Sequence, residues 1–187
     1  DTSDYISFTR IRIEGLQMIA EVDVRGKLSL RSGESYHPAR LNREVRSLMS
    51  MGCFQDVSWI YDAPAQQLLI QISENPVIER IEFSGNTVVP GADLLKILQQ
   101  QQGAVLNVNF LREDIKSIEA HYRNAGYTLA KVLSAQRPLE AGDPLLYTIS
   151  EGVIEKIVLL GNDNTKDFVI LREMKLKSGI VFKKDIF

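Results

Sequence analysis

Cysteine and histidine are scarce in this chain of 187 residues, which has one cysteine, Cys53, and two histidines, His37 and His121. One thiol cannot form an internal disulfide, and the two histidines belong to no spaced metal-binding motif. Long apolar runs are also missing, because the longest, 157–160, has four residues, whereas a membrane-spanning helix needs about 20. We therefore expect no metal, no cofactor and no membrane-spanning helix.

An excess of charge of either sign is absent too, since 22 basic and 24 acidic residues leave a net charge of −2. Proteins that bind nucleic acid usually carry a basic surface, so we expect no nucleic-acid partner. The sequence contains no G-x-S-x-G motif, no glycine-rich phosphate loop and no G-x-x-G loop. We therefore expect no enzyme, although a small α/β enzyme or an RNA-binding module stays open as an alternative.

What the chain does contain is a repeated pattern of glycines. Three glycines each follow a segment of alternating polarity, and three more stand 18 positions later (33 − 15, 103 − 85, 179 − 161): Gly15, Gly85 and Gly161, then Gly33, Gly103 and Gly179. Apolar residues align in five columns on this register, for example Ile11, Ile81 and Ile157. Self-similarity of this kind indicates three copies of one structural unit.

Each copy predicts the element order β-α-α-β-β. Alternating polarity predicts an initial strand, apolar residues four apart such as Val24 and Leu28 predict a first helix, and the second glycine is expected to end that helix. The second helix is clearest from Val108 to Tyr122, with Asn107 as its N-cap. Two hairpins are then expected, pairing 55–61 with 67–73 and 129–136 with 145–150.

We therefore expect domains at residues 1–76 and 77–152, and the first part of a third at 153–187, after which the natural protein would continue. The interdomain joints are short, with Asn75 and Pro76 in the first and Glu151 and Gly152 in the second. Proline fixes its φ angle and glycine loosens the backbone, so the first joint should be stiffer than the second.

The pattern resembles the POTRA (polypeptide-transport-associated) domain. The resemblance rests on a strand ending in glycine, often followed by asparagine, on two helices, and on a glycine–aromatic step at 52–54 and 126–127. It also rests on a hairpin ending in Ser-Glu-Asn-Pro at 73–76 or Ser-Glu-Gly-Val at 150–153, and the step at 151–154 is similar to the cyanobacterial and chloroplast branch. Tandem POTRA domains precede the membrane barrel of outer-membrane assembly proteins.

The resemblance implies an α+β fold in which each repeat has a three-stranded mixed sheet with two helices on one face. The last strand would be central and the second would lie at an edge, where an extended client polypeptide can add as a further strand. The candidate client-binding residues are Gln55, Asp56, Val57, Ser58, Trp59 and Ile60 in repeat one, and Leu129, Ala130, Lys131, Val132 and Leu133 in repeat two. Trp59 is expected to face the core, given how buried tryptophan is on average.

The function that the resemblance implies is a periplasmic receptor for non-native polypeptides, attached to the outer membrane through a barrel, or its equivalent in the chloroplast envelope. The implied partners are unfolded outer-membrane or translocating polypeptides, the barrel of the same protein, and accessory proteins or the membrane surface. Four lysines of the third copy could face lipid headgroups or simply solvent: Lys175, Lys177, Lys183 and Lys184. The POTRA region of a two-partner secretion transporter is the alternative within this family.

Overall fold

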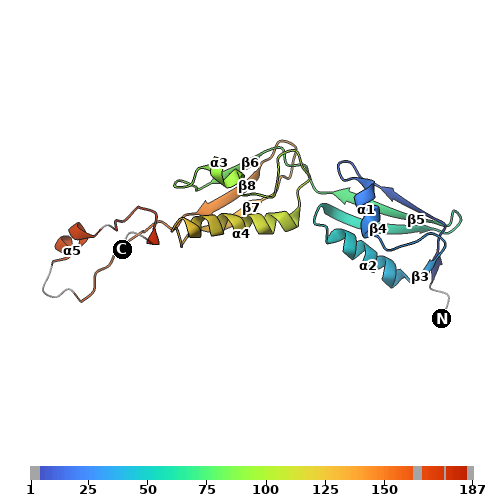
Figure 1. Cartoon of the computed structure of the whole chain (residues 1–187), viewed down its shortest axis with the longest axis horizontal. Helices are drawn as coiled ribbons and strands as arrows, with labels where there is room; N and C mark the ends of the chain where they lie inside the picture. Colours follow the sequence, from blue (N-terminus) through green and yellow to red (C-terminus); the bar gives the residue numbers. More distant parts are fainter. Residues whose placement is uncertain (1–4, 162–165, 175, 185–187) are drawn as a thin grey trace. The chain divides into compact units, whose positions relative to one another are not determined.

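The computed structural model describes residues 5–161, 166–174 and 176–184 (Figure 1). It forms two compact units: unit 1 comprises residues 1–78 with 100–111, and unit 2 comprises 79–99 with 112–187. Residues 100–111, which belong to repeat two in the sequence, therefore pack with unit 1. The domain boundaries at 76 and 152 stay a prediction.

Unit 1 contains a three-stranded mixed sheet and two helices. Its elements are β1 (Ile6–Ser7), β2 (Arg10–Glu14), α1 (Glu21–Lys27), β3 (Ser35–Tyr36), α2 (Pro38–Met49), β4 (Phe54–Asp62) and β5 (Gln67–Glu74). The strand order is β2-β5-β4, with β5 parallel to β2 and antiparallel to β4. A short ribbon, β1 with β3, adds two strands that the sequence pattern does not predict.

Unit 2 repeats this arrangement. Its elements are β6 (Ile81–Ser84), α3 (Gly91–Leu95), α4 (Val108–Asn124), β7 (Lys131–Gln136), β8 (Leu145–Ser150) and α5 (Asp167–Glu173), and α4 begins among residues that pack with unit 1. The strand order is β6-β8-β7, again with a parallel and an antiparallel pair. The expected α+β fold, with the last strand of each repeat in the centre, is confirmed.

The core of each unit lies between the sheet and its helices. In β8 every second residue is buried, Leu145, Tyr147 and Ile149, which is the signature of a strand with one face on a core. Ile118 and Tyr122 of α4 are fully buried on the helix side. In unit 1 the corresponding core cluster includes residues of α1, α2, β4 and β5: Val24, Leu48, Val57, Ile70 and Ile72.

The first glycine of each complete repeat is required by a close approach of two strands. Gly15 and Gly85 both have positive φ, and a Cβ at either would clash with the backbone oxygen of the central strand, at Ile72 and Ile149 respectively. No side chain fits between the two backbones, which explains why both repeats have glycine here. Gly161 also has positive φ but open space around it.

The second glycine does not end a helix, so that prediction is wrong. The helices α1, α3 and α5 end at residues 27, 95 and 173, several positions earlier. Instead the glycine turns the chain with positive φ and donates its N–H to the start of its own repeat. The three bonds are equivalent: Gly33 to Phe8 O at 2.8 Å, Gly103 to Ile78 O at 2.7 Å, and Gly179 to Ile154 O at 2.7 Å.

The third repeat forms its first helix, α5, but residues 155–160 do not form the expected strand. The equivalent strands β2 and β6 each pair with the last strand of their own repeat, and the described residues after 160 contain no strand that pairs with 155–160. A strand without its ladder lacks the hydrogen bonds that define it. The expected start of a second helix falls largely on residues 185–187, outside the described residues.

Candidate functional site

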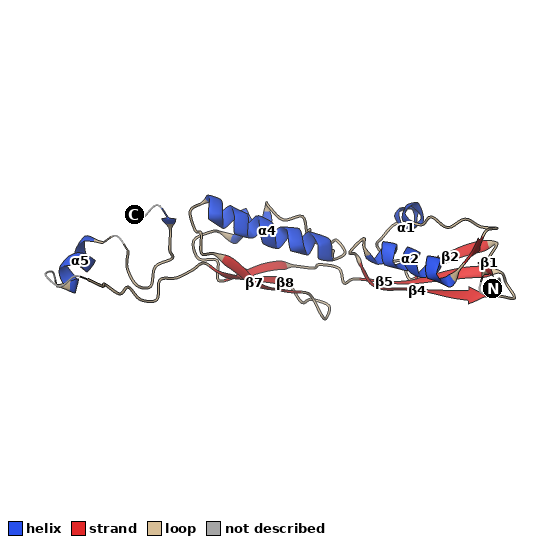
Figure 2. Cartoon of the chain, turned by 90° about the horizontal axis from the view of Figure 1, so that it is seen from below, coloured by secondary structure: helices blue, strands red, loops and turns tan. Residues whose placement is uncertain are grey.

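The two candidate strands, β4 and β7, each lie at an edge of their sheet, as predicted. In each unit the long helix lies on one face of the sheet (Figure 2): α2 contacts β4, and α4 is bonded to β7 through Glu119 and to β8 through Asp114. An edge strand leaves every second backbone N–H and C=O without a partner in the sheet, and these groups are the template for adding a strand.

The outward amides of β7 follow from the pairing of β8. Leu145 donates its N–H to Arg80 O beside β6, so every second residue of β8, including Ile149, turns its amide toward β6. Val132 pairs with Ile149, so its own N–H points away from the sheet. The same rule makes Ala135, the partner of Tyr147, the next outward amide.

The outward amides of β4 follow in the same way. The N–H of the first residue of β2 donates to Gln66 O, so the even-numbered residues of β5 turn toward β2. Their partners on β4 therefore turn outward, and these partners are Val57, Trp59 and Tyr61. Repeat one thus offers three outward amides at a regular spacing of two residues.

One outward amide of β7 already has a partner. The carboxylate of Glu119 on α4 accepts a hydrogen bond from the N–H of Val132, with the nitrogen and oxygen 3.1 Å apart. No side chain accepts a bond from a backbone amide of β4, all of whose residues lie in the described part of the chain. The two edges therefore differ in how much of their backbone is available.

The two edges also differ in regularity. In β4 the register shifts between Phe54 and Asp56, at the beginning of the strand, and the ladder is regular from there to Asp62. In β7 it shifts between Val132 and Ser134, which makes Leu133 an extra residue in the middle of a six-residue strand. Bulges of this kind interrupt an edge and discourage further pairing.

The side chains of the candidate residues divide between the two faces. Trp59 packs against the cluster of Phe8, Tyr36, Leu41 and Leu68, and its indole N–H donates to Asn42 Oδ1 at 2.8 Å. The tryptophan therefore lies on the core face, as expected. Ile60 and Leu133 are 49% and 66% exposed.

Two of the candidate residues do not lie on a strand. Strand β7 begins at Lys131, so Leu129 and Ala130 belong to the turn that precedes it, and Ala130 is buried. A Cβ on Gly152 would lie 2.5 Å from the Cβ of Leu129, so this turn packs on the second joint. The sequence pattern extends the strand too far because these apolar residues fill space between the helix end and that joint.

The residues of the first joint are held by an asparagine within unit 1. Asn75 is buried, and its side-chain amide donates to the oxygens of Gly52 and Leu106, both at 3.0 Å. The N–H of Leu106 donates to Pro76 O, and that of Val108 to Gly52 O. The same backbone bonds recur in unit 2, where Phe182 donates to Gly152 O and Lys184 to Gly126 O, but the second joint has the single residue Gly152 between Glu151 and Val153 where the first has Asn75 and Pro76.

In each unit, a glutamate at the end of the central strand accepts hydrogen bonds from the turn that follows the first strand of the sheet. Glu74 accepts hydrogen bonds from the backbone amides of residues 17–19. Glu151 accepts from the amide of Val88 and from the hydroxyls of Thr87 and Tyr122. Burial acts to raise the pKa of Glu151, but these hydrogen bonds outweigh it, so the pKa is lowered. The hydroxyl of Tyr122 has a raised pKa, through its burial and then through this carboxylate.

Sequence reasoning misses the buried acids of the long helices. Asp114 is fully buried and accepts hydrogen bonds from Gln99 N–H at 2.6 Å and from Tyr147 Oη at 3.1 Å. Its counterpart Glu44 accepts from the amide and hydroxyl of Ser29. The signal that could identify Asp114 and Glu44 from the sequence is an acidic residue on the apolar side of a helix. This signal is weaker for Glu119, whose side chain is half-buried.

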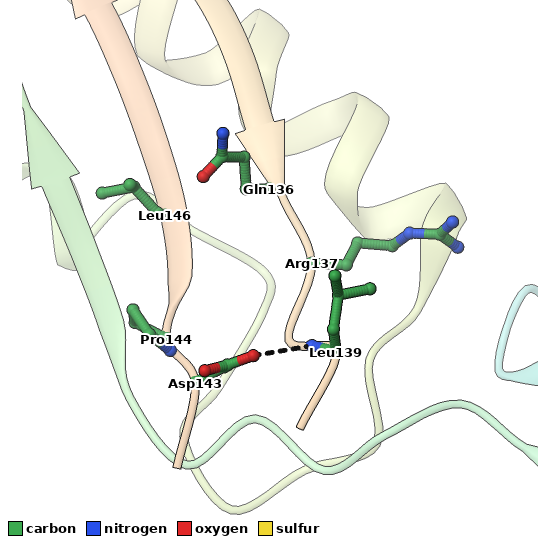
Figure 3. A pocket seen from close by; sticks show the side chains of 6 residues that line it. All are labelled: Gln136, Arg137, Leu139, Asp143, Pro144 and Leu146. Carbon is green, nitrogen blue, oxygen red and sulfur yellow. Dashed lines mark hydrogen bonds between the residues drawn. The ribbon is translucent and has the colours of Figure 1, made fainter. Parts of the chain in front are cut away.

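A surface depression of about 600 Å³ lies at the hairpin end of β7 (Figure 3). The carboxylate of Asp143 closes the hairpin by accepting from the backbone amides of Leu139 and Glu140. Leu139 is 90% exposed beside it. The lining residues are Gln136, Arg137, Leu139, Asp143, Pro144 and Leu146.

The described residues contain no group of three or more His, Cys, Asp or Glu that could hold a metal ion. No helix among them is sufficiently long and apolar to cross a membrane. Cys53 is buried, which raises the pKa of its thiol. Of the four lysines considered above, Lys183 lies 5.4 Å from the ring centre of Tyr127, and Lys175 falls outside the described residues.

Comparisons with known proteins identify this arrangement. A POTRA family model, described as a surface antigen variable number repeat, matches residues 76–152. The outer membrane protein assembly factor BamA of Nitratidesulfovibrio vulgaris is 27% identical over 175 residues, which cover 87% of this chain and 22% of that protein. BamA of Neorickettsia risticii is 26% identical over 92% of this chain and 24% of that protein. The chain thus spans less than a quarter of the length of these relatives.

Two solved structures share the fold. The N-terminal domain of Omp85 from the thermophilic cyanobacterium Thermosynechococcus elongatus superposes with a TM-score of 0.86 at 24% identity, covering 97% of this chain and 81% of that one. POTRA domains 1–3 of the periplasmic domain of Omp85 from Anabaena give a TM-score of 0.68 at 25% identity, covering 96% and 79%.

The repeated sheets, their edge strands and these matches define a tandem array of POTRA domains, a class without catalytic activity. Residues 76–152 match the POTRA family model, and the chain as a whole is similar to the POTRA regions of Omp85 and BamA proteins.

Proposed function

We propose that this chain is the receptor region of an outer-membrane assembly protein and that it binds non-native polypeptides by strand addition. The observation that carries the proposal is the edge of β4, with three regularly spaced outward amides that no side chain caps. Main-chain hydrogen bonds supply affinity without demanding a particular sequence, which suits a receptor for many clients.

The partners in this proposal are unfolded outer-membrane or translocating polypeptides and a membrane barrel of the same protein, and the compartment is the periplasm. Support comes from the relatives, whose names describe outer membrane protein assembly factors and a periplasmic domain. Clients of such a protein share alternating polarity along extended segments, and an added strand presents that alternation to the two faces of the sheet. Docking of accessory proteins or of the membrane surface is a further part of the proposal.

The experiment uses a ten-residue peptide of alternating polarity and two versions of it that carry N-methyl groups on complementary sets of alternate residues. An added strand donates only every second N–H to the edge, so one methylated version should lose binding and the other should retain it. Calorimetry with the whole chain measures all three affinities. The proposal is wrong if the parent peptide does not bind, or if both methylated versions bind as well as the parent.

A further inference from the structure

We propose that the two edges have different roles: β4 accepts the added strand, whereas Glu119 and the bulge at Leu133 close β7 to it. This inference rests on the proposed function, since it names which edge performs it. It replaces the expectation, drawn from the repeat, that the second strand of every repeat is an equivalent binding edge.

The edge of β4 matches an incoming strand over its whole regular length. Val57, Trp59 and Tyr61 present amides two residues apart, which is the spacing at which an antiparallel or a parallel partner can pair. The bulge of β4 lies before Asp56 and therefore outside this run.

The edge of β7 matches poorly for two independent reasons. Its outward amides, at Val132 and Ala135, are three residues apart because of the bulge, so a regular strand that pairs with one is out of register at the other. The first of them also donates to Glu119, so an incoming carbonyl must displace a carboxylate. Hydrogen bonds to ionised acceptors are stronger than those to neutral ones.

The solvent-facing side chains of β4 indicate what kind of segment fits. Asp56, Ser58, Ile60 and Asp62 alternate with the core-facing residues and so share the outer face of the sheet. Neither aspartate belongs to an ion pair among the described residues, and Ile60 between them is 49% exposed. The partner is therefore an extended segment with an apolar side chain opposite Ile60 and basic side chains near its ends on that face.

Trp59 provides a site-specific signal, because it is the only tryptophan in the chain and lies on β4. The probe is a tryptophan-free ten-residue peptide of alternating polarity with lysines near both ends, and its binding should change the emission of Trp59. Val57→Pro removes the first outward N–H of β4. The control Val57→Ala removes a similar part of the side chain but keeps the backbone N–H. We expect Val57→Pro to bind about tenfold more weakly than Val57→Ala, which corresponds to one lost hydrogen bond.

Glu119→Ala tests the closed edge, with Glu113→Ala as the control because it removes the same charge from an exposed position of α4 paired with Lys116. Glu119→Ala should accelerate hydrogen exchange at Val132 and leave the Trp59 titration unchanged. In the double variant that combines Val57→Pro and Glu119→Ala, any residual peptide binding should occur at β7. It should then appear as shifts of the amide signals of Val132 and Ala135. Glu113→Ala should change none of these.

The outcomes separate the inference from the proposed function. In the unmodified chain, the peptide could bind without changing the emission of Trp59 while shifting the amide signals of Val132 and Ala135. That result would overturn the inference but support strand addition. Equal affinity of Val57→Pro and Val57→Ala overturns it as well. If no peptide binds, both the inference and the proposed function are wrong. If hydrogen exchange at Val132 is unchanged in Glu119→Ala, Glu119 does not protect the edge of β7.

Discussion

Repeats one and two build the same sheet, yet they leave different edges. Each places its last strand between a parallel and an antiparallel neighbour, and each uses a glycine where two backbones meet. The edge of repeat one is regular and uncapped after its first residues, whereas that of repeat two is bulged and bonded to Glu119. Edge strands are commonly protected by bulges and charges, so repeat two follows the usual practice and repeat one departs from it.

The cap of β7 comes from the long helix of its unit. Helix α4 (Val108–Asn124) is five residues longer (17 − 12) than α2 (Pro38–Met49) and carries Glu119, whereas no side chain of α2 accepts a hydrogen bond from a backbone amide of β4. Glu119 reaches the amide of Val132. The comparison teaches that a repeated fold can assign different roles to equivalent strands through one side chain.

The largest effect is expected from truncating a buried side chain in the core of one unit only, so that one edge strand loses packing and the other does not. Ile118 is fully buried in unit 2 and Leu48 in unit 1, so Ile118→Ala or Leu48→Ala should each cost about 2–5 kcal/mol of unfolding free energy through the cavity left behind. Hydrogen exchange resolved by residue is the measurement. Ile118→Ala should release the amides of β7 and β8 before those of β4 and β5, and Leu48→Ala should do the reverse. If each variant accelerates exchange equally in both sheets, the two edges are not supported by separate cores.

A smaller effect is expected at Glu151, which fastens the turn at 87–88 to the sheet behind β7. Glu151→Ala leaves the buried hydroxyl of Tyr122 without its acceptor and should cost about 2–3 kcal/mol. Because the folded pKa of Glu151 is lowered from 4.5, its contribution is complete above about pH 4.5 and is lost as the pH falls further.

Denaturant titrations of the parent and of Glu151→Gln between pH 3 and 7 test this sign, with Glu113→Gln as the exposed control. The parent should lose more stability than Glu151→Gln below pH 4.5, and the control should follow the parent. A parent that becomes more stable on acidification would contradict the assignment.

Proline substitutions on β7 are expected to have unequal effects because neighbouring amides point in opposite directions. Lys131 pairs with Ser150 and turns its N–H toward β8, so Lys131→Pro should break a ladder bond and cost about 1–3 kcal/mol. Val132→Pro removes only the bond to Glu119 and should cost about 0.5–1.5 kcal/mol. Thermal unfolding followed by circular dichroism measures both, with Lys131→Ala and Val132→Ala as controls. A reversed order would mean that the outward direction of Val132 is wrong.

Much of the fold could be predicted from the sequence because the repeat makes each apolar position testable three times. Periodicity identifies the long helix ending near Tyr122 and the two hairpins, and three copies reveal the glycines. The helix stops are misplaced because a glycine with positive φ serves a turn as well as it serves a helix end.

The candidate edges could be placed only in outline. Their direction, the bulge at Leu133 and the bond from Val132 to Glu119 depend on register and on a contact between distant residues, neither of which leaves a periodic trace. The family resemblance supplies the strand order, but a family pattern describes what repeats share. The difference between the two edges arises where the repeats diverge.

The smallest effect is expected at Asn75, where the two repeats differ again. Its side chain donates to the oxygens of Gly52 and Leu106, whereas the second joint consists of Glu151 and Gly152 and has no side-chain amide to donate. Asn75 should therefore slow the opening of the neighbouring bonds donated by Leu106 and Val108, in line with the expectation of a stiffer first joint.

Asn75→Ala should accelerate hydrogen exchange at Leu106 and Val108 about fivefold, which corresponds to roughly 1 kcal/mol for one net hydrogen bond. The amides of Phe182 and Lys184 make the equivalent backbone bonds in unit 2 and serve as the internal reference. In the parent they should exchange faster than their counterparts in unit 1, and the substitution should narrow that difference. If Phe182 and Lys184 are already the better protected pair, the asparagine does not stiffen the first joint, and the backbone bonds common to both joints determine their stability.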